Sequence, residues 1–527
     1  MASDASAIAA YAPTALDEIT VNVQTLQKTF RSNRTKDIDF RIQQLRKLYW
    51  GIHDNVPLLK EAVLRDLRKS HYESALTEIN WCLQECLDQI NNIHKWSKDE
   101  NIPNIPLQYR LMRPRMRSEP LGTILVIGAY NFPIQLNLCP VIGAIAAGNT
   151  VLLKPSELSP CTAMVLKKIF DESLDPECYA CVNGALEVSK HIMEQKFSKI
   201  VFTGGKKTGA IIAQKAGETL TPVLLELGGQ NPAFVTKNAD IKIAARRLLW
   251  QKCVSAGQLC LSQNYALVER SVVDEFIQAL KDEVKVFMPQ GTKESPDLAR
   301  IVNSSHFNRL KKMLDESKGK IVVGGSMDES ELFIEPTVVL VDSIEDSLMA
   351  DETFGPIWSI LPFDSLDDAI DIANTVDPTP LGLYTFGSDE ENKKILYNVT
   401  SGGATVNDGL FHAMMNPSPL GGIGGSGQGS YHGIFSFKAF SHQRAIAEVP
   451  RWADKLLRVR YMPYDAKELK RHEAMSAGKP NFDRNGNVVK GLGYWVSFIV
   501  TLGAKKASGG ALRPVNDEQQ QKQQHIE

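Results

Sequence analysis

Apolar residues recur at helical spacing through residues 16–100, with charged residues between them. Leu45 and Leu48 show the pattern, which gathers apolar side chains on one face of a helix. The proline-rich segment 101–106 is expected to end these helices. Residues 107–118 alternate basic and apolar positions around an internal proline, which predicts an edge hairpin and not a central strand.

From Glu119 onward, short apolar runs alternate with helix-like segments. Such alternation predicts a parallel sheet covered on both faces, with ligand sites at the carboxyl ends of the strands. Residues 231–411 repeat this texture, which indicates a second α/β domain. The expected strands are residues 122–128, 150–154, 179–183 and 199–203, and the expected helices are residues 140–148, 162–173 and 207–216.

The C-terminal part of the chain has a different texture. Residues 430–445 are aromatic and strand-like, and we expect them to pair with segment 107–118 or with a partner subunit. From about residue 465 the chain is charged, then glycine-rich, then apolar over residues 491–504, and finally polar with a run of glutamines. We therefore interpret residues 465–527 as a tail.

The composition narrows the class of protein. A chain of 527 residues exceeds one hydrophobic core, so two or three domains are expected. The net charge of −2 provides no basic field for nucleic acid. Eight cysteines in so long a chain do not suggest a disulfide scaffold, and Cys178 and Cys181 lack the second pair that a zinc site needs. We expect reduced thiols in an intracellular protein without a secretory signal.

One carboxylate and one thiol stand out in the middle of the chain. Glu226 precedes a Gly-Gly turn, and Cys260 follows the small-residue loop 255–258. An acid and a nucleophile are what covalent chemistry with a later hydrolytic step requires. Taken alone, however, a glutamate is more often solvated and a cysteine among apolar residues is more often part of a core.

Polar residues follow three of the expected strands. Asn131 follows the first strand, where a side-chain amide can donate to a developing oxyanion, although asparagine is also a common turn former. Lys154 and Glu157 follow the second strand and suit either the hydroxyls of a ribose or a helix cap. The sequence GGKKTG at 204–209 opens a helix, whose N-terminal N–H groups can bind phosphate.

Nine motifs occur in one order, and together they resemble those of the aldehyde dehydrogenase superfamily. The resemblance covers residues 25–460 and is closest to the class 3 and fatty aldehyde branch, which includes fungal members acting on apocarotenoid aldehydes. The cues for that branch are GAIAAGNTVLLKPSELSP, LTPVLLELGGQNP and YHGIFSFKAFSHQR. The nine motifs are YNFP, GAIAAGN, KPSE, FTGG, LELGGQNP, SAGQLC, DETFGP, SGGATVN and GGIGGSG.

The resemblance implies an α/β fold with a Rossmann-like NAD(P)-binding domain, an α/β catalytic domain and a small antiparallel bridging element. It also implies a homodimer in the cytoplasm. The implied boundaries are 1–106 and 119–227 for the NAD(P)-binding domain with the N-terminal helices, 228–425 for the catalytic domain, 107–118 and 426–447 for the bridging and oligomerisation strands, and 465–527 for the tail.

The resemblance further implies a role for individual residues, and it implies no metal. Cys260 matches the nucleophile, Glu226 the general base and Asn131 the oxyanion donor. The cofactor contacts are Lys154 and Glu157 at the adenosine ribose, Gly204, Gly205, Lys206, Lys207, Thr208 and Gly209 at the phosphate turn, and Glu352 and Phe354 at the nicotinamide ribose and ring.

Three positions depart from the family pattern. Leu259 stands where members commonly have a small residue, Gln263 where many have proline, and Leu420 where many have phenylalanine. These changes affect the walls of the site and leave the reactive groups in place. They therefore weaken any inference about the substrate without changing the expected reaction type.

The function implied by the resemblance is NAD(P)-dependent oxidation of an apolar aldehyde, long-chain or apocarotenoid, to the acid through a thiohemiacetal and a thioester on Cys260. Two alternatives remain: a CoA-acylating relative, against which the hydrolytic base Glu226 argues, and a catalytically silent binding protein, against which the intact reactive groups argue. Glu157 favours NAD because its charge repels a 2′-phosphate, and NADP stays an alternative.

The apolar segment 491–504 is too short to span a membrane. As a helix its 14 residues would reach about 21 Å, whereas a bilayer core is about 30 Å thick. One interpretation is a helix packed on the dimer or on the substrate mouth. We favour an in-plane helix that makes a peripheral contact with an intracellular membrane, with Tyr494 and Trp495 at the interface and flanking lysines on lipid phosphates.

Overall fold

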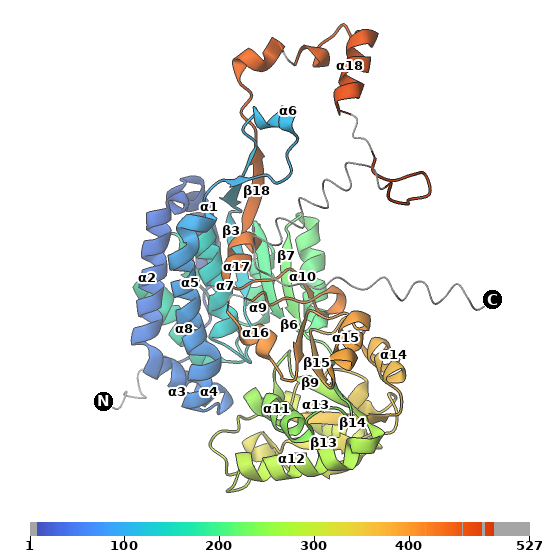
Figure 1. Cartoon of the computed structure of the whole chain (residues 1–527). Coiled ribbons are helices and arrows are strands. Elements are labelled where there is room, and N and C mark those ends of the chain that lie inside the picture. The colour runs from blue at the N-terminus through green and yellow to red at the C-terminus, as the bar shows by residue number, and fades with distance from the viewer. Residues whose placement is uncertain (1–7, 417, 456, 477–479, 490–527) are drawn as a thin grey trace, which may run out of the picture. The chain divides into compact units, whose positions relative to one another are not determined.

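The computed structural model describes residues 8–416, 418–455, 457–476 and 480–489 (Figure 1). The chain divides into two units. One consists of Met1–Ile105 and Pro114–Ala447, and the other of Pro106–Arg113 and Glu448–Glu527. The two large β-sheets and the predicted site residues belong to the first unit.

The N-terminal region is helical, as the apolar spacing predicts. Leu45 and Leu48 are fully buried, and they belong to the same apolar cluster as residues of the first sheet. Figure 1 shows most of these helices in blue along one side of that sheet, whereas α1 packs on its other face. They are α1 (Leu16–Arg31), α2 (Ile38–Asp54), α3 (Val56–Leu67), α4 (His71–Ser74), the π-helical turn η3 (Ala75–Ile79) and α5 (Asn80–Trp96).

The first large sheet has six strands in the order β17-β7-β6-β3-β4-β5, all parallel except β17. Alternate residues of its strands face opposite sides: Val126 packs toward α2, α5, α7 and α8, whereas Leu125 packs toward α1, α9 and α10. The doubly covered parallel sheet confirms the predicted fold class. The elements are β3 (Thr123–Ile127), α7 (Gln135–Ala147), β4 (Thr150–Lys154), α8 (Pro160–Ser173), β5 (Tyr179–Cys181), α9 (Leu186–Met193), β6 (Lys199–Gly204), α10 (Lys206–Glu218), β7 (Val223–Leu227) and β17 (Gly427–Gln428).

The second large sheet has seven strands in the order β10-β13-β14-β9-β8-β15-β16, and β10 is its antiparallel member. Separate apolar clusters cover its two faces, one with α11 and α12 and the other with α13, α14 and α15. The elements of this region are β8 (Asn231–Val235), α11 (Ile241–Cys253), β9 (Gln263–Glu269), α12 (Val273–Phe287), α13 (Ser304–Glu316), β10 (Lys320–Val323), β13 (Thr337–Leu340), β14 (Ile357–Phe363), α14 (Leu366–Val376), β15 (Gly382–Phe386), α15 (Asp389–Asn398), β16 (Gly403–Val406) and α16 (Phe411–Met414). Between β10 and β13, β11 (Met327–Asp328) and β12 (Phe333–Ile334) form a separate two-stranded antiparallel sheet.

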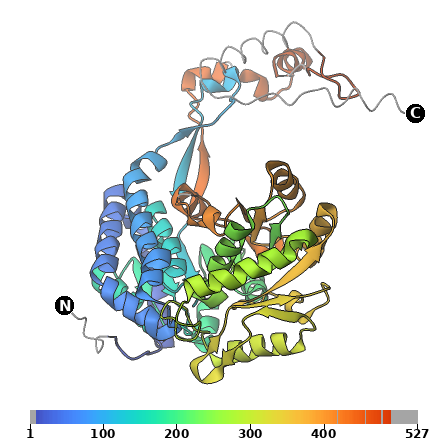
Figure 2. The same ribbon diagram turned by 60° about the horizontal axis from the view of Figure 1, so that its bottom comes forward.

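A small antiparallel sheet joins distant parts of the chain. It consists of β1 (Glu100–Asn101), β2 (Arg115–Pro120) and β18 (Ser441–Ile446) in that order, and Figure 2 shows β2 and β18 side by side. The expected pairing of these two regions is therefore present. The domain boundaries drawn around them stay a prediction.

Two details of that prediction are wrong. Segment 107–118 is not a hairpin, because α6 (Leu107–Arg110) forms a helical turn before β2. Residues 430–445 are not one strand, because α17 (Gly433–Ala439) precedes β18. The aromatic positions 435 and 437 suggest the period of a strand. The buried Phe437 and Phe440, however, follow helical spacing and pack with α5 and α7 in the first core.

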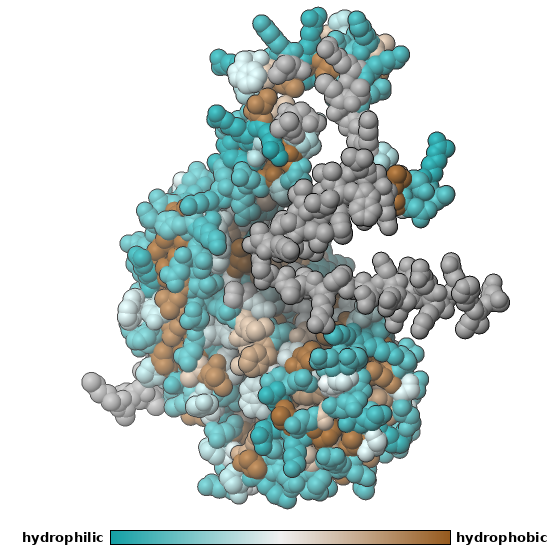
Figure 3. Space-filling view, in the orientation of Figure 1, coloured by the Kyte–Doolittle hydropathy of each residue, from teal (hydrophilic) through white to brown (hydrophobic). Residues whose placement is uncertain are grey.

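The second unit contains short helical elements: η9 (Arg451–Lys455), η10 (Arg458–Arg460) and α18 (Ala466–Ser476). The backbone N–H of Glu448 donates to the carbonyl of Met112 over 2.7 Å within this unit. The predicted helix 491–504 lies outside the described residues. Among the residues that are described, no helix has the length and apolar character to cross a bilayer. The coloured surface is mainly hydrophilic in the view of Figure 3.

Candidate active site

A cavity of about 1060 Å³ opens at the carboxyl ends of β3, β4, β6 and β7. All but one of the predicted site residues line it, from Lys154 and Glu157 to Cys260. The exception is Gly209 of α10, which faces the sheet instead. A Cβ at Gly209 would lie 2.6 Å from Leu227 Cδ2, so this glycine allows α10 to pack closely on β7.

The loop before Cys260 has a constrained backbone. Ser255 and Ala256 adopt positive φ angles of 52° and 51°, which side chains rarely favour. Gly257 has a φ of +69°, and a Cβ there would lie 2.2 Å from the carbonyl oxygen of Gly355. Gln258 Nε2 donates to the carbonyl of Ser255 at 3.0 Å and closes the loop. These contacts hold the backbone that carries Cys260 in one conformation.

The Cys260 side chain lies where two cavities meet. It lines the large cleft and also an apolar pocket of about 70 Å³. Burial raises the pKa of its thiol, and Glu352 and Glu226 raise it further, while the N–H groups of Cys260 and Leu261 lower it. The thiol is therefore mainly protonated at neutral pH until a base or a bound ligand changes its surroundings.

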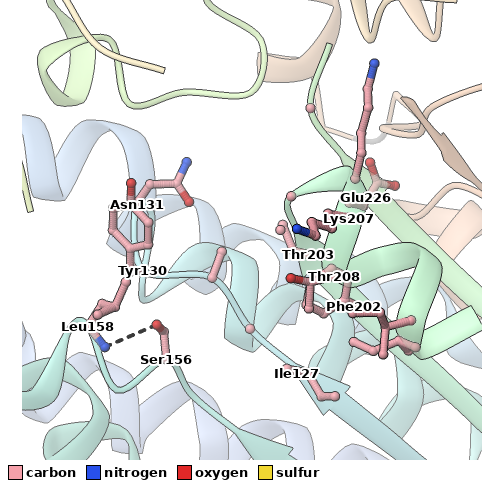
Figure 4. A pocket seen from close by; sticks show the side chains of 18 of the residues that line it. Ile127, Tyr130, Asn131, Ser156, Leu158, Phe202, Thr203, Lys207, Thr208 and Glu226 are labelled. Atoms are coloured by element: carbon pink, nitrogen blue, oxygen red, sulfur yellow. Dashed lines mark hydrogen bonds between the residues drawn. The ribbon is translucent and has the colours of Figure 1, made fainter. Parts of the chain in front are cut away.

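Asn131 lies between β3 and α7 and is 3% exposed. Its Nδ2 donates to the carbonyl of Gln258 over 2.8 Å, so the amide lies beside the loop that leads to Cys260. A side-chain NH₂ group has two hydrogens, and the second is available for another acceptor. Figure 4 shows Asn131 and Tyr130 on one wall of the cleft and Glu226 on the opposite wall.

Glu226 occupies β7 just before the strand ends and is 4% exposed. Burial raises its pKa well above the usual range of a carboxyl group. Its Oε1 atom is buried and has no hydrogen-bond partner among the described residues. An unpaired buried acceptor is costly, so this one is suited to a water molecule or substrate that enters the cleft.

The other end of the cleft is suited to a dinucleotide. Lys154 Nζ lies 2.8 Å from Glu157 Oε2 at the end of β4, where a ribose can reach both groups. No described side chain caps the start of α10, and a Cβ at Gly205 would have no described atom within 4 Å. A phosphate can therefore approach the first N–H groups of the helix. These residues fit the adenosine and phosphate part of NAD(P).

Glu352 and Phe354 lie in the loop that precedes β14. A Cβ at Gly228 would come within 2.0 Å of Glu352 Oε2, so the carboxylate rests against the turn after β7. Burial raises the pKa of Glu352 to about 8, and Lys206 opposes that rise. Phe354 has a φ of 46°, and its ring meets Tyr130 edge-on at 6.2 Å.

Sequence reasoning missed two residues of this wall. Arg309 of α13 donates to the carbonyl of Thr353 over 2.6 Å and so holds the loop of Glu352. His306, one turn earlier, meets the Tyr130 ring at 5.6 Å, and both residues line the cleft. They lie outside the nine motifs. Their spacing on an amphipathic helix is an ordinary pattern that does not distinguish a cavity from a core.

The apolar pocket on the other side of Cys260 contains two of the three positions that depart from the family pattern. Leu259 and Leu420 both line it, whereas Gln263 is buried and donates to the carbonyl of Leu248 over 2.7 Å. Cys253, expected to belong to the core, packs against apolar clusters of the second sheet. The other residues that line the apolar pocket beside Cys260 are Thr77, Trp81, Phe132, Gln135, Leu136, Trp250, Val254, Leu261, Leu410, Ala413 and Met414.

A metal site is not apparent in the described part of the chain, where no group of His, Cys, Asp and Glu is arranged to hold an ion. The fold contains two large α/β sheets, and a cleft of about 1060 Å³ leads over the strand ends of the first sheet to a cysteine. This arrangement is typical of nucleotide-dependent oxidoreductases that use a thiol.

Comparison with known proteins agrees with this class. Residues 2–446 match the model of the aldehyde dehydrogenase family, and the chain belongs to that family. It is an aldehyde dehydrogenase, an oxidoreductase that acts on the aldehyde group.

Two fungal proteins and one solved structure are similar to the chain over most of its length. A protein named beta-apo-4'-carotenal oxygenase from Gibberella fujikuroi is 63% identical over 95% of this chain and 93% of its own. One of the same name from Neurospora crassa is 52% identical over 97% of this chain and 96% of its own. The substrate-bound structure of Staphylococcus aureus AldH has a TM-score of 0.83 and 36% identity, and the match covers 87% of this chain and 99% of that one.

Proposed function

We propose that this aldehyde dehydrogenase oxidises an elongated apolar aldehyde, of the apocarotenoid or long-chain fatty type, with NAD as its preferred cofactor. The observation that carries the proposal is the position of Cys260 between a polar cleft and an apolar pocket. A hydrocarbon chain is favoured in the apolar pocket, because leaving water stabilises it by roughly 25 cal/mol per Å² buried. The names of the fungal relatives support the same substrate class.

The residues of the site are assigned the following roles. The Cys260 thiolate attacks the aldehyde carbon and forms a thiohemiacetal. The second hydrogen of the Asn131 amide and the N–H of Cys260 donate to the oxyanion. A bound NAD(P), held with its nicotinamide near Glu352 and Phe354, would supply the hydride acceptor that turns the Cys260 adduct into a thioester. Glu226 then takes a proton from the water that attacks the thioester, which releases the acid and the thiol.

The preference for NAD over NADP is proposed from charge at the ribose end of the cleft. Glu157 can accept from the ribose hydroxyls, and its charge disfavours a 2′-phosphate. Lys154 pairs with this carboxylate and moderates the repulsion, so NADP is a weaker alternative cofactor. Glu157→Gln should keep use of NAD and raise kcat/KM with NADP; an unchanged ratio between the two cofactors would contradict the assignment.

The substrate proposal is tested with NAD and a series of aldehydes from short aliphatic chains to an apocarotenoid, with and without CoA. We expect kcat/KM to rise with apolar length and the product to be the free acid in both conditions. A preference for short aldehydes would refute the apolar substrate, and acyl-CoA as the product would show that CoA replaces water. Leu420→Ser should lower kcat/KM for the long aldehydes more than for the short ones.

We also propose a homodimer, which the family resemblance implies, and a peripheral membrane contact through the tail, which the apolar sequence 491–504 supports. The dimer is tested by sedimentation of the full chain, for which a single monomeric species is the contrary result. The membrane contact is tested by deleting residues 488–527 and comparing sedimentation with liposomes. Loss of co-sedimentation is expected, and equal sedimentation of both proteins would rule the contact out.

A further inference from the structure

A buried ion pair lies beneath the loop that carries Asn131. Lys69 and Glu78 are both 0% exposed, and Lys69 Nζ lies 2.8 Å from Glu78 Oε1. Lys69 Nζ also donates to the backbone carbonyl of Asn131 over 2.9 Å and lies 4.0 Å from the centre of the Phe132 ring. A buried charge is costly unless each polar atom has a partner, and here the partners belong to this loop.

The carboxylate of the same pair holds the other end of the loop. Glu78 belongs to the π-helical turn η3, a kind of turn often found at functional sites. Its Oε2 atom accepts from the N–H of Ile134 over 2.8 Å. The pair therefore contacts the carbonyl of Asn131 on one side of Pro133 and the N–H of Ile134 on the other. The loop lies between β3 and α7, and the pair adds to contacts from α7, whose Leu136 N–H and Asn137 Nδ2 donate to the carbonyls of Phe132 and Pro133 over 3.1 and 2.8 Å.

A third residue of the same segment reaches the loop before Cys260. Glu73 Oε1 accepts from the N–H of Ser255 over 2.8 Å. Ser255 Oγ in turn donates to the carbonyl of Asn131 over 3.3 Å, and Asn131 Nδ2 donates to the carbonyl of Gln258 over 2.8 Å. Segment 69–78 thus connects the loop of the amide donor with the loop of the thiol through hydrogen bonds.

We propose that Lys69 and Glu78 are positioning residues of the oxyanion site, holding the backbone of Asn131 so that its amide faces the carbon attacked by Cys260. The inference rests on the proposed role of Asn131. A buried ion pair adds little net stability compared with apolar residues of similar volume, so stability alone does not account for it. A role in orienting Asn131 accounts for the pair, because displacing a catalytic group by about 1 Å can lower the rate on the order of 10²-fold.

The first test replaces the pair by neutral side chains. Lys69→Met alone leaves Glu78 buried without its partner and is expected to unfold more easily. The double variant Lys69→Met/Glu78→Gln removes both charges and keeps a hydrogen-bond acceptor for Ile134. We expect it to fold, to bind NAD as the unmodified protein does, and to form NADH in the first turnover about 10- to 100-fold more slowly. A first turnover at the unmodified rate overturns the proposal.

A matched control separates positioning from a general effect of removing a buried cation. Arg41 is also buried and donates to the carbonyls of Thr35, Lys36 and Ala146 at 2.7, 2.8 and 3.3 Å, none of which belongs to either active-site loop. Arg41→Met should lower the unfolding midpoint and leave the first-turnover rate unchanged. An equal slowing in Arg41→Met would mean that loss of stability, and not orientation, produces the effect.

The second test asks whether the pair acts through Asn131. Asn131→Ala is expected to slow the first turnover, and adding the double substitution should then slow it little further, since the group that the pair orients is gone. If the first-turnover rate of the triple variant falls by the product of the two separate fold-losses, the pair does not act through Asn131. That result overturns the positioning role and leaves the role of Asn131 intact. An unchanged rate in Asn131→Ala would instead refute the proposed oxyanion donor, and the inference with it.

Discussion

Replacing Glu226 by glutamine should separate the two halves of the reaction. The change conserves the shape of a side chain that is 4% exposed and removes its ability to accept a proton. General-base catalysis typically contributes about 10²–10⁴-fold in rate, which corresponds to about 3–5 kcal/mol of activation free energy. Steady turnover is expected to fall by that factor, because hydrolysis of the thioester needs the base.

The first half of the reaction should survive in this variant. Rapid mixing with aldehyde and excess NAD should produce a burst of about one NADH per site, followed by a slow phase. Neither burst nor turnover would mean that Glu226 also activates the Cys260 thiol. Unimpaired steady turnover would refute the reasoning and make Glu352 the candidate base.

The same substitution has a predictable effect on stability. Burial raises the pKa of Glu226 in the folded protein, whereas the unfolded chain keeps a value of about 4.3. The folded state therefore binds the proton more tightly. The contribution of Glu226 to stability is fully present below about pH 4.3 and is lost as the pH rises through the folded pKa. The neutral amide avoids this loss, so Glu226→Gln should be at least as stable as the unmodified protein at alkaline pH in denaturant unfolding.

Three further predictions concern the thiol and its loop. Cys260→Ala should abolish NADH formation and keep cofactor binding, whereas Cys253→Ala should stay active; substantial turnover by the first variant would refute the nucleophile. Gly257→Ala should lower the free energy of unfolding by about 1–3 kcal/mol, because φ is +69° and the new Cβ would meet the Gly355 carbonyl. Gly217 lies in open space on α10, so Gly217→Ala should leave the free energy of unfolding unchanged or raise it by up to about 1 kcal/mol. An equal loss of unfolding free energy in both glycine variants would contradict this reasoning. Because burial raises the pKa values of Cys260 and Glu226, and both act deprotonated, kcat/KM should rise from about pH 6 to about pH 9; a fall over that range would contradict these assignments.

The sequence predicts the polar side of the site well for a physical reason. Lys154, Gly204 and Gly205 lie at the ends of parallel strands, and the carboxyl ends of such strands meet at one edge of the sheet. Local sequence is therefore enough to place these residues together. Gly209 belongs to the same motif, but it allows α10 to pack on β7 and does not line the cleft. The sequence could not reveal this role, because it depends on the contact with Leu227.

The fold was predicted less well where a segment is apolar on all sides. The expected helix 140–148 runs from Pro140 to the glycine that ends it. The observed α7 begins at Gln135, and every one of its residues is buried. A helix that is surrounded by protein has no polar face, so its sequence carries no periodic signal for its start. α17 escaped prediction for a related reason, because its aromatic residues pack on α5 and α7.

The residues that the sequence could not reveal share one property: they act on a segment that is distant in the chain. Lys69 and Glu78 contact Asn131 and Ile134, and Arg309 contacts the loop of Glu352. A lysine and a glutamate nine positions apart usually indicate a solvated helix face. Full burial reverses that interpretation, because each charge must then be compensated by specific partners, and those partners include backbone atoms of the loop that carries Asn131.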